Sequence, residues 1–234
     1  MTPREAEPRI TLFGPAVTPY TLKVVRALRL KRLSFTLCEP RDLEDFRRWS
    51  PRTGLLPVLE LDGERVADSV AILDVLDERF PEPPLTSADP KLAREQRSLE
   101  TWVGEAFPFY HFRSLRARLG TVGSGEGAPG AVGPMARLGL IGPDGKIRPE
   151  FFDTSGGGPG PEFTRRLDDL AKLLGERPYF FGDRISRADL AVFGFLDGLV
   201  TDRHRGGSAL VRARPNLWEH TERVDRATGG GAPG

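Results

Sequence analysis

The chain has 234 residues, of which 38% are hydrophobic and 29% charged, a balance typical of a globular protein with a buried core. Its formal net charge of +1 provides no bulk attraction to nucleic acid or to an anionic membrane, so neither is expected as a partner. Cys38 is the only cysteine, which excludes a disulfide within the chain and favours a reducing, cytoplasmic location.

Residues 1–80 alternate strand and helix patterns. Thr18-Pro19 follows a short apolar run and opens a segment with helical spacing, in which Leu22, Val25 and Leu28 form one face. The basic residues of that segment turn elsewhere: Lys23, Arg26 and Arg29. The patterns predict the order β-α-β-α-β-β-α, at residues 10–13, 18–30, 35–38, 42–49, 58–61, 64–67 and 69–80.

The predicted strands belong to one mixed sheet. Two strands joined through a helix imply a parallel pair with a right-handed crossover. Asp62-Gly63, between two short strand-like runs, suits the two-residue type I′ turn of an antiparallel hairpin. We therefore expect an α/β domain over residues 8–81, with helices on the faces of its sheet.

A second, all-α domain is expected after a linker. The stretch PEPPLTSADP is too rich in proline to continue a helix and predicts a linker over residues 82–90. Helical spacing then predicts an all-α domain over residues 91–227, whose first helix, capped by Asp89, runs from Pro90 to about residue 119 with a kink near Pro108. Glycine and proline predict an irregular segment over residues 120–161, with one short helix near 135–140, and a disordered tail over 228–234.

The last part of the chain carries clear helix start and stop signals. A helix is expected from Phe163, and Gly175 suits its C′ position. A capping box with a hydrophobic staple is predicted at Ser186, Asp189, Ile185 and Leu190. The helix that follows is apolar nearly all round and should lie in the centre of its domain, and a final helix should span residues 215–227.

Several kinds of site are not expected. No apolar run approaches the roughly 20 residues that cross a bilayer, and the N-terminus lacks the apolar core of a signal peptide. The three histidines, His111, His204 and His220, lie far apart without cysteines at ligand spacing, so no metal site is expected. No glycine-rich phosphate-binding motif is present.

Three stretches, in this order, resemble the glutathione S-transferase superfamily. They are TPYT (18–21), GLLPVLELDGERVADS (54–69) and GDRISRADLAVFGFL (182–196), and the first looks like the glutaredoxin C-P-Y-C motif with both cysteines replaced by threonine. The resemblance covers most of the chain. It implies a thioredoxin-like N-terminal domain that binds glutathione as a co-substrate, an all-helical C-terminal domain and a homodimer.

Thr18 has two interpretations. The resemblance implies a hydroxyl that donates a hydrogen bond to the glutathione thiolate, as Ser or Tyr does in the family. The local sequence equally suits a plain N-cap with Pro19 at the first helical position, and the two roles can hold together. A covalent thiol mechanism is excluded here because no cysteine is present, and Cys38 is expected in the buried core, remote from the turn.

Two further segments complete the implied glutathione site. We expect a cis peptide bond at Leu56-Pro57, which would turn the Val58 backbone toward an extended peptide; the simpler alternative is that Pro57 starts an edge strand. At the next helix, the free N–H groups and the Ser69 hydroxyl suit the γ-glutamyl carboxylate. Three roles are open for Asp68: it binds the α-ammonium group of glutathione, it forms part of a dimer interface, or it is a plain N-cap.

One feature departs from the family pattern. Family members often place a polar residue just before the cis-proline to meet the glycine carboxylate of glutathione, whereas this chain has Leu55 and Leu56. Arg52 or Arg47 would have to substitute.

The acceptor substrate is expected to face Thr18. Tyr110 and His111 have polar ends and are the residues expected to line its pocket. Trp102 and Phe107 are more simply explained as core residues, because aromatic side chains at helical spacing are usually buried.

The leading hypothesis is a glutathione transferase that conjugates the thiolate to a small apolar electrophile. A second hypothesis is a non-catalytic binding or scaffold protein of the same fold. A third comes from RPYFFGDRISRADLAVFGFL and RPNLWEHTERV, which resemble the prostaglandin E synthase of the second type, although the thiol motif of that family is missing.

Overall fold

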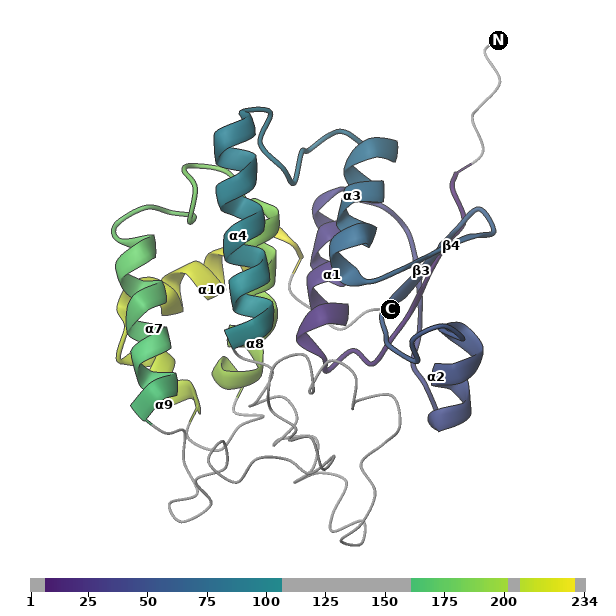
Figure 1. Cartoon of the computed structure of the whole chain (residues 1–234). Helices are drawn as coiled ribbons and strands as arrows, with labels where there is room; N and C mark the ends of the chain where they lie inside the picture. The colour runs from purple at the N-terminus through teal and green to yellow at the C-terminus, as the bar shows by residue number, and fades with distance from the viewer. Residues whose placement is uncertain (1–6, 107–160, 202–206, 230–234) are drawn as a thin grey trace, which may run out of the picture. The chain divides into compact units, whose positions relative to one another are not determined.

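The computed structural model describes residues 7–106, 161–201 and 207–229, and its chain divides into two compact units (Figure 1). Unit 1 comprises residues 1–85 together with 226–234, and unit 2 comprises residues 86–225. Several predictions lie outside the described residues: the helix beyond 106 with its kink at Pro108, nearly all of the irregular segment 120–161, the short helix near 135–140 and the last residues of the tail.

Unit 1 contains a four-stranded mixed sheet in the order β2-β1-β3-β4. β1 and β2 are parallel, while β3 is antiparallel to both β1 and β4, which confirms the predicted crossover and hairpin. Asp62 and Gly63 have φ of 51° and 92°, the positive values that a type I′ turn requires. The strands are β1 (Ile10–Phe13), β2 (Thr36–Cys38), β3 (Val58–Leu61) and β4 (Glu64–Ala67).

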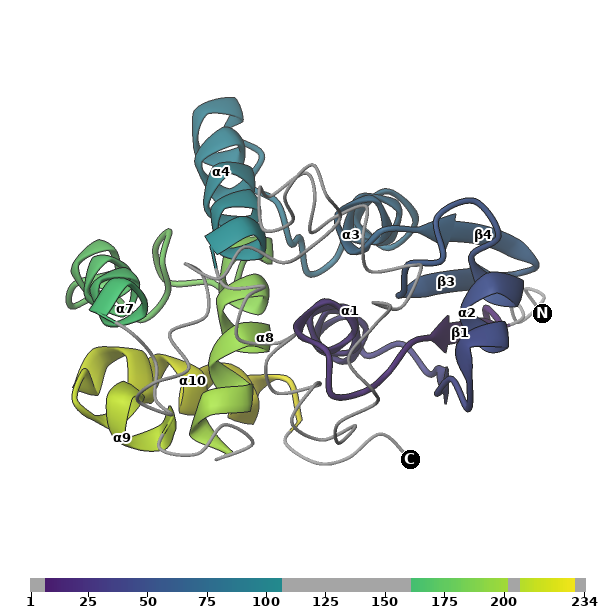
Figure 2. The same ribbon diagram turned by 60° about the horizontal axis from the view of Figure 1, so that its bottom comes forward.

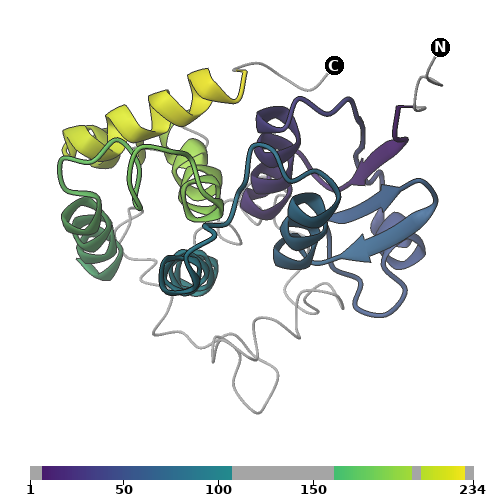
Figure 3. The same cartoon turned by 90° about the horizontal axis from the view of Figure 1, so that it is seen from above.

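Helices cover both faces of this sheet: α1 (Pro19–Leu30), α2 (Leu43–Trp49) and α3 (Ser69–Arg79). α1 and α3 pack on one face and α2 on the other (Figures 2 and 3). Leu12 and Leu59, paired across β1 and β3, are fully buried. On the α2 side, Phe13 lies 4.9 Å from Trp49 between ring centroids. The element order is the β-α-β-α-β-β-α of a thioredoxin-like domain, as expected.

The basic residues of α1 differ from the prediction. Lys23 and Arg26 are buried, although the helical pattern placed them off the apolar face. Arg26 Nη1 donates to the Thr228 hydroxyl at 3.1 Å, and Arg29 Nη1 donates to the Gly229 carbonyl at 3.0 Å. The sequence placed Thr228 in a disordered tail, whereas its side chain is buried against α1. Periodicity within one helix cannot reveal a partner about 200 residues later in the chain.

Lys31, just after α1, joins three parts of unit 1. Its side chain is fully buried, and its ammonium donates to Asp77 Oδ1 (2.9 Å), the Phe80 carbonyl (2.6 Å) and the Pro83 carbonyl (2.8 Å). Asp77 Oδ1 also accepts the Leu85 N–H at 2.8 Å. All three ammonium donors therefore have acceptors, and the start of the linker is held against the end of α3.

The regular elements in the described residues of unit 2 are all helices, joined by loops that include one isolated β-bridge between Tyr179 and Gly182. Asp89 caps its first helix, accepting the Lys91 N–H at 2.7 Å, and Gly175 ends the second with a φ of 60°, both as predicted. α8 lies between α4, α7 and α10 (Figure 3) and is buried along most of its length. The helices are α4 (Pro90–Ala106), α7 (Pro161–Leu174), α8 (Arg187–Val200), α9 (Gly207–Arg212) and α10 (Pro215–Ala227).

The predicted capping box at the start of α8 is present. Asp189 Oδ2 accepts the N–H (2.9 Å) and the hydroxyl (2.7 Å) of Ser186. Its Oδ1 accepts the Phe180 N–H at 2.9 Å and lies 2.9 Å from His220 Nε2. One buried carboxylate therefore holds the start of α8, the preceding loop and α10 together. The neighbouring Arg187 forms a buried ion pair with Glu100.

Replacement of Lys31 by methionine should destabilise the protein by about 3 kcal/mol, because Asp77 and two carbonyl oxygens would lose a buried donor. Chemical denaturation measures the loss. Lys172→Met, at an exposed position of α7, is the matched control and should change stability by less than about 0.5 kcal/mol. Equal effects of the two substitutions would contradict this account of Lys31.

Candidate functional site

The candidate site lies at one edge of the sheet in unit 1. Phe13 pairs with Val58, and Val58 with Ala67, so that one row of residues ends β1 and β4 and begins β3. Because β3 runs opposite to both neighbours, the segment after β1, the segment before β3 and the segment after β4 all leave the sheet at this edge. These three segments carry the residues that the sequence predicts for glutathione binding.

Thr18 is the N-cap of α1, as one of its two interpretations requires. Its backbone is extended, with φ of −85° and ψ of 139°, and its hydroxyl oxygen accepts the Thr21 N–H at 3.2 Å. The same hydroxyl donates to the Thr21 hydroxyl at 2.8 Å and lies 3.2 Å from the Pro15 carbonyl oxygen. Thr18 is half-buried, so a ligand at the sheet edge could still reach it.

Gly14 brings the first two segments into contact. A Cβ atom at Gly14 would lie 2.5 Å from Thr21 Oγ1 and 3.4 Å from Pro57 Cβ. The Gly14 N–H donates to the Cys38 carbonyl at 3.0 Å, which fixes this backbone against β2. Only a glycine fits between the start of α1 and the proline, and the sequence analysis did not single it out.

The Leu56-Pro57 bond is cis, in agreement with the prediction. Pro57 and Val58 are buried, and Leu56 is half-buried. Among the described residues, no hydrogen-bond partner is found for the Leu56 backbone N–H or C=O. An extended peptide could therefore pair with Leu56 without displacing a bond of the protein.

Asp68 is the N-cap of α3, so the simpler of its interpretations holds. Its carboxylate accepts the N–H groups of Val70 (2.8 Å) and Ala71 (3.2 Å), and its φ is 80°. These two N–H groups are therefore not available to a ligand, contrary to the expectation of several free donors. The hydroxyl of Ser69, a residue that is 5% exposed, makes no hydrogen bond within the described ranges.

Tyr20 is a residue of this edge that the sequence analysis missed. Burial and the nearby Asp68 carboxylate raise the pKa of Tyr20 to about 12. α1 packs against α3, and Tyr20, in the first turn of α1, is electrostatically coupled to Asp68 at the N-terminus of α3. No pattern in the sequence indicates this coupling, because Tyr20 and Asp68 belong to different helices whose packing is set by the tertiary structure.

The structure corrects the expectation for Cys38. This residue is half-exposed rather than buried in the core. It pairs with Phe13 at the end of β2, and its carbonyl binds Gly14, so it lies next to the start of the turn rather than remote from it. The strand pattern alone could not show which end of β2 meets the turn.

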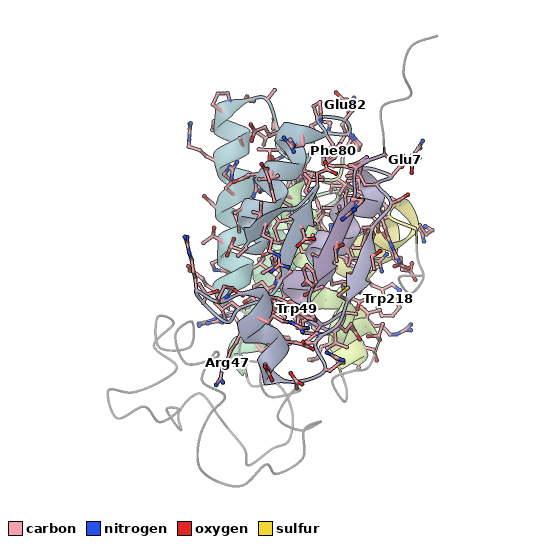
Figure 4. All side chains as sticks on the ribbon, turned by 90° about the vertical axis from the view of Figure 1, so that its right-hand side faces the viewer. Glu7, Arg47, Trp49, Phe80, Glu82 and Trp218 are labelled. Carbon is pink, nitrogen blue, oxygen red and sulfur yellow. The ribbon has the colours of Figure 1, made fainter. Side chains whose placement is uncertain are left out.

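Four arginines lie on or next to α2, and two of them pair with Asp45. Asp45 accepts the backbone N–H (2.9 Å) and Nε (3.3 Å) of Arg41 and forms an ion pair with Arg48. Hydrogen bonding to the Arg41 backbone N–H and the two guanidinium groups lowers the pKa of Asp45. Arg47 and Arg52 are exposed and form no ion pair within the described part of the chain; Figure 4 shows Arg47 on the outer side of α2.

Most of the residues considered for the acceptor-substrate pocket lie in a part of the chain that the structure does not describe. Tyr110, His111 and Phe107 lie outside the described residues, while Trp102, expected in the core, is 37% exposed on α4. Within the described ranges, no group of three or more His, Cys, Asp or Glu side chains could hold a metal ion. No helix in those ranges is long and apolar enough to cross a membrane.

Comparisons with known sequences match both units. Residues 12–84 match the family described as Glutathione S-transferase, N-terminal domain, and residues 163–224 match Glutathione S-transferase, C-terminal domain. Isoprene-epoxide–glutathione S-transferase from Rhodococcus sp. (strain AD45) is 25% identical over 92% of this chain and 97% of its own length. Failed axon connections from Drosophila melanogaster is 33% identical over 36% of this chain and 18% of its own length.

A comparison with solved structures supports the same fold. A glutathione S-transferase from Methylobacterium radiotolerans, in complex with glutathione sulfonate, superposes with a TM-score of 0.65. The alignment covers 93% of this chain and 90% of that protein, with 24% sequence identity.

Gly14→Ala should destabilise the protein by about 1–3 kcal/mol, because the added methyl group collides with the buried Thr21 side chain. Thr21→Ala makes space for it, so the double variant Gly14→Ala/Thr21→Ala should recover part of this loss. A double-mutant cycle from chemical denaturation measures the coupling. Additive effects would show that the two side chains do not compete for the same space.

The unfolding free energy should fall by about 2 kcal/mol between pH 10 and 12, because the unfolded chain loses the Tyr20 proton near pH 10 while the folded protein keeps it to about pH 12. The contribution is fully present below pH 10. Tyr20→Phe should flatten this part of the pH profile, measured by urea denaturation at each pH. Parallel profiles for the variant and the wild type would contradict the burial of the Tyr20 hydroxyl beside Asp68.

Proposed function

This chain belongs to the glutathione S-transferase superfamily, and we propose that it binds glutathione at the sheet edge of unit 1 and conjugates its thiolate to a small apolar electrophile. Thr18 is the proposed hydrogen-bond donor to the thiolate sulfur. Leu56, Pro57 and Val58 would hold the cysteinyl part of the peptide, and Asp68 with Ser69 would hold its γ-glutamyl end.

One observation carries this proposal: the three segments that leave the sheet at one edge each carry a hydrogen-bonding group that the tripeptide needs. A hydroxyl is available at Thr18, unpaired backbone groups at Leu56, and a hydroxyl at Ser69. The contacts at Gly14 bring the first two segments together, and the coupling of Tyr20 to Asp68 brings the third close to the first.

Thr18 would act on the acidity of the bound thiol. A free cysteine thiol has a pKa of about 8.5, so only a few per cent is thiolate at neutral pH. A hydrogen bond to a charged acceptor contributes about 1.5–3 kcal/mol, which corresponds to a fall of about 1–2 pKa units. Pro19 has no N–H and the Thr21 N–H is capped by Thr18, so two of the backbone donors at the start of α1 are absent or engaged, and the Thr18 hydroxyl is the proposed donor.

The γ-glutamyl end of glutathione would meet a hydrogen-bond donor, the Ser69 hydroxyl, and a negative charge, the Asp68 carboxylate. The Ser69 hydroxyl would donate to the carboxylate at the N-terminus of α3, where the helix dipole favours a negative charge. The Asp68 carboxylate would attract the α-ammonium while its capping bonds to Val70 and Ala71 stay in place. The two residues would thus select an amino acid end rather than a simple carboxylate.

The glycine carboxylate would need a cation from the α2 region. Arg41 and Arg48 are already engaged by Asp45. We propose Arg52 or Arg47 for this contact, because both are exposed and carry no ion pair within the described ranges. Positions 55 and 56 are both leucine, so neither offers a polar side chain for this contact.

A non-catalytic binding or scaffold function is the second candidate. The Thr18 hydroxyl already caps α1 and donates its proton to Thr21, so catalysis would require that proton to be redirected to the sulfur. The prostaglandin E synthase alternative requires a thiol in the turn, and TPYT has none.

The resemblance to glutathione transferases also implies that two copies of the chain form a homodimer. Sedimentation analysis would detect that homodimer.

Glutathione titration with an ultraviolet thiolate readout tests the proposed function. The wild type should bind glutathione and lower its thiol pKa by about 1–2 units. Thr18→Ala should lose most of that shift, while Thr18→Ser should keep it because the hydroxyl is retained. Binding without a pKa shift would favour the scaffold function, and no binding at millimolar glutathione would exclude the proposal.

A further inference from the structure

The two threonines of TPYT form a pair of hydroxyls at the start of α1. Thr21 is fully buried, and its hydroxyl oxygen lies 2.8 Å from that of Thr18. Within the described residues, the Thr21 hydroxyl has no other hydrogen-bond partner. The absent Cβ of Gly14 leaves the space that this hydroxyl occupies, since a Cβ there would lie 2.5 Å from Thr21 Oγ1.

A count of protons and lone pairs shows what this pair can do. A hydroxyl has one proton to donate and two lone pairs that accept. Thr18 Oγ1 uses one lone pair for the Thr21 N–H and directs its single proton to Thr21 Oγ1 at 2.8 Å, with the Pro15 carbonyl oxygen at 3.2 Å as the alternative acceptor. In this arrangement the Thr21 proton has no acceptor within the described part of the chain. Because hydroxyl protons rotate freely between acceptors, the 2.8 Å contact can be made in either direction.

A bound thiolate would favour the opposite direction. If the sulfur accepts the Thr18 proton, the short contact to Thr21 persists only when Thr21 donates its own proton to Thr18 Oγ1. Both lone pairs of Thr18 are then occupied by donors from Thr21, its N–H and its O–H. The Thr18 hydroxyl can then only donate. The Thr21 N–H, the Thr21 O–H, the Thr18 O–H and the sulfur then each have a hydrogen-bond partner.

We propose that Thr21 is a positioning residue for glutathione activation, whose hydroxyl reverses on binding and makes Thr18 a donor that cannot accept. This inference rests on the proposed function, in which Thr18 contacts the sulfur. Its consequence is selectivity for the thiolate over the thiol. A neutral thiol cannot donate its S–H to Thr18, which has no lone pair left, and its sulfur accepts only weakly, whereas a thiolate accepts the Thr18 proton in a stronger, charge-assisted bond. No proton is gained or lost by the pair, because each threonine keeps its own.

The buried location makes the arrangement specific. Threonine has two preferred χ1 rotamers in a helix, and the 2.8 Å contact shows that the one adopted by Thr21 directs its hydroxyl at Thr18. The lack of exposure excludes water as a competing partner for Thr21. A hydroxyl pair of this kind replaces the two thiols that a C-x-x-C motif would carry, and it performs no redox chemistry.

The test measures the thiol pKa of bound glutathione in Thr21→Val, which keeps the shape of threonine and removes the hydroxyl. The pKa should rise by about half to one unit relative to the wild type, because Thr18 regains a lone pair that stabilises the neutral thiol. Thr21→Ser keeps the hydroxyl and should restore the wild-type pKa. Thr36→Val, at an exposed position of β2, is the matched control and should leave the pKa unchanged.

Each outcome separates this inference from the proposed function. If the wild type does not lower the thiol pKa, both fail. If the wild type lowers it and Thr18→Ala loses the shift, but Thr21→Val has the wild-type pKa or a lower one, only the role of Thr21 is overturned. Should Thr21→Val not fold, Thr21→Ala and Thr21→Ser provide the same comparison, and equal pKa values for those two would overturn the proposal.

Discussion

The direction of β3 is the constraint on which the site depends. β3 runs antiparallel to both neighbours, and Phe13, Val58 and Ala67 share one row at the edge of the sheet. Three segments distant in sequence must therefore leave the sheet together. A shift of one residue in either pairing would turn the alternate side chains to the wrong face, so burial of residues such as Leu12 and Leu59 fixes the register and, with it, the site.

Buried polar groups fix the positions of the loops in both units. Lys31 holds the start of the linker against the end of α3, and Asp189 holds the loop before α8 together with α10. Apolar burial is not directional, whereas these charged groups have geometric requirements. Leaving one partner unpaired costs more than the pair contributes, so such groups favour a single arrangement of the segments that they join.

The kind of ligand that the sheet edge can bind depends on which hydrogen-bonding groups the fold leaves unpaired there. The N-caps Thr18 and Asp68 satisfy the N–H groups of their own helices, so the helix ends offer fewer free donors than the sequence suggests. In the described part of the chain, the groups left at this edge are side-chain hydroxyls and the unpaired backbone of Leu56. A peptide with a sulfur at its centre fits that supply better than a phosphate or another anion that needs several N–H groups.

Local patterns in the sequence determined the element order, the caps at Thr18, Asp68 and Ser186 and the type I′ turn, because each follows from residues that are neighbours in the chain. The cis bond before Pro57 was expected from the resemblance carried by three separate stretches, with a plain strand start as the alternative. Only the tertiary structure decided which of these neighbourhoods meet. The contact of Gly14 with Thr21 and Pro57, the coupling of Tyr20 to Asp68, and the burial of Arg26 against Thr228 join segments that are separated in sequence. Spacing along a chain gives the face of a helix or strand, but the partner of that face is fixed by packing and by the pairing of distant polar groups.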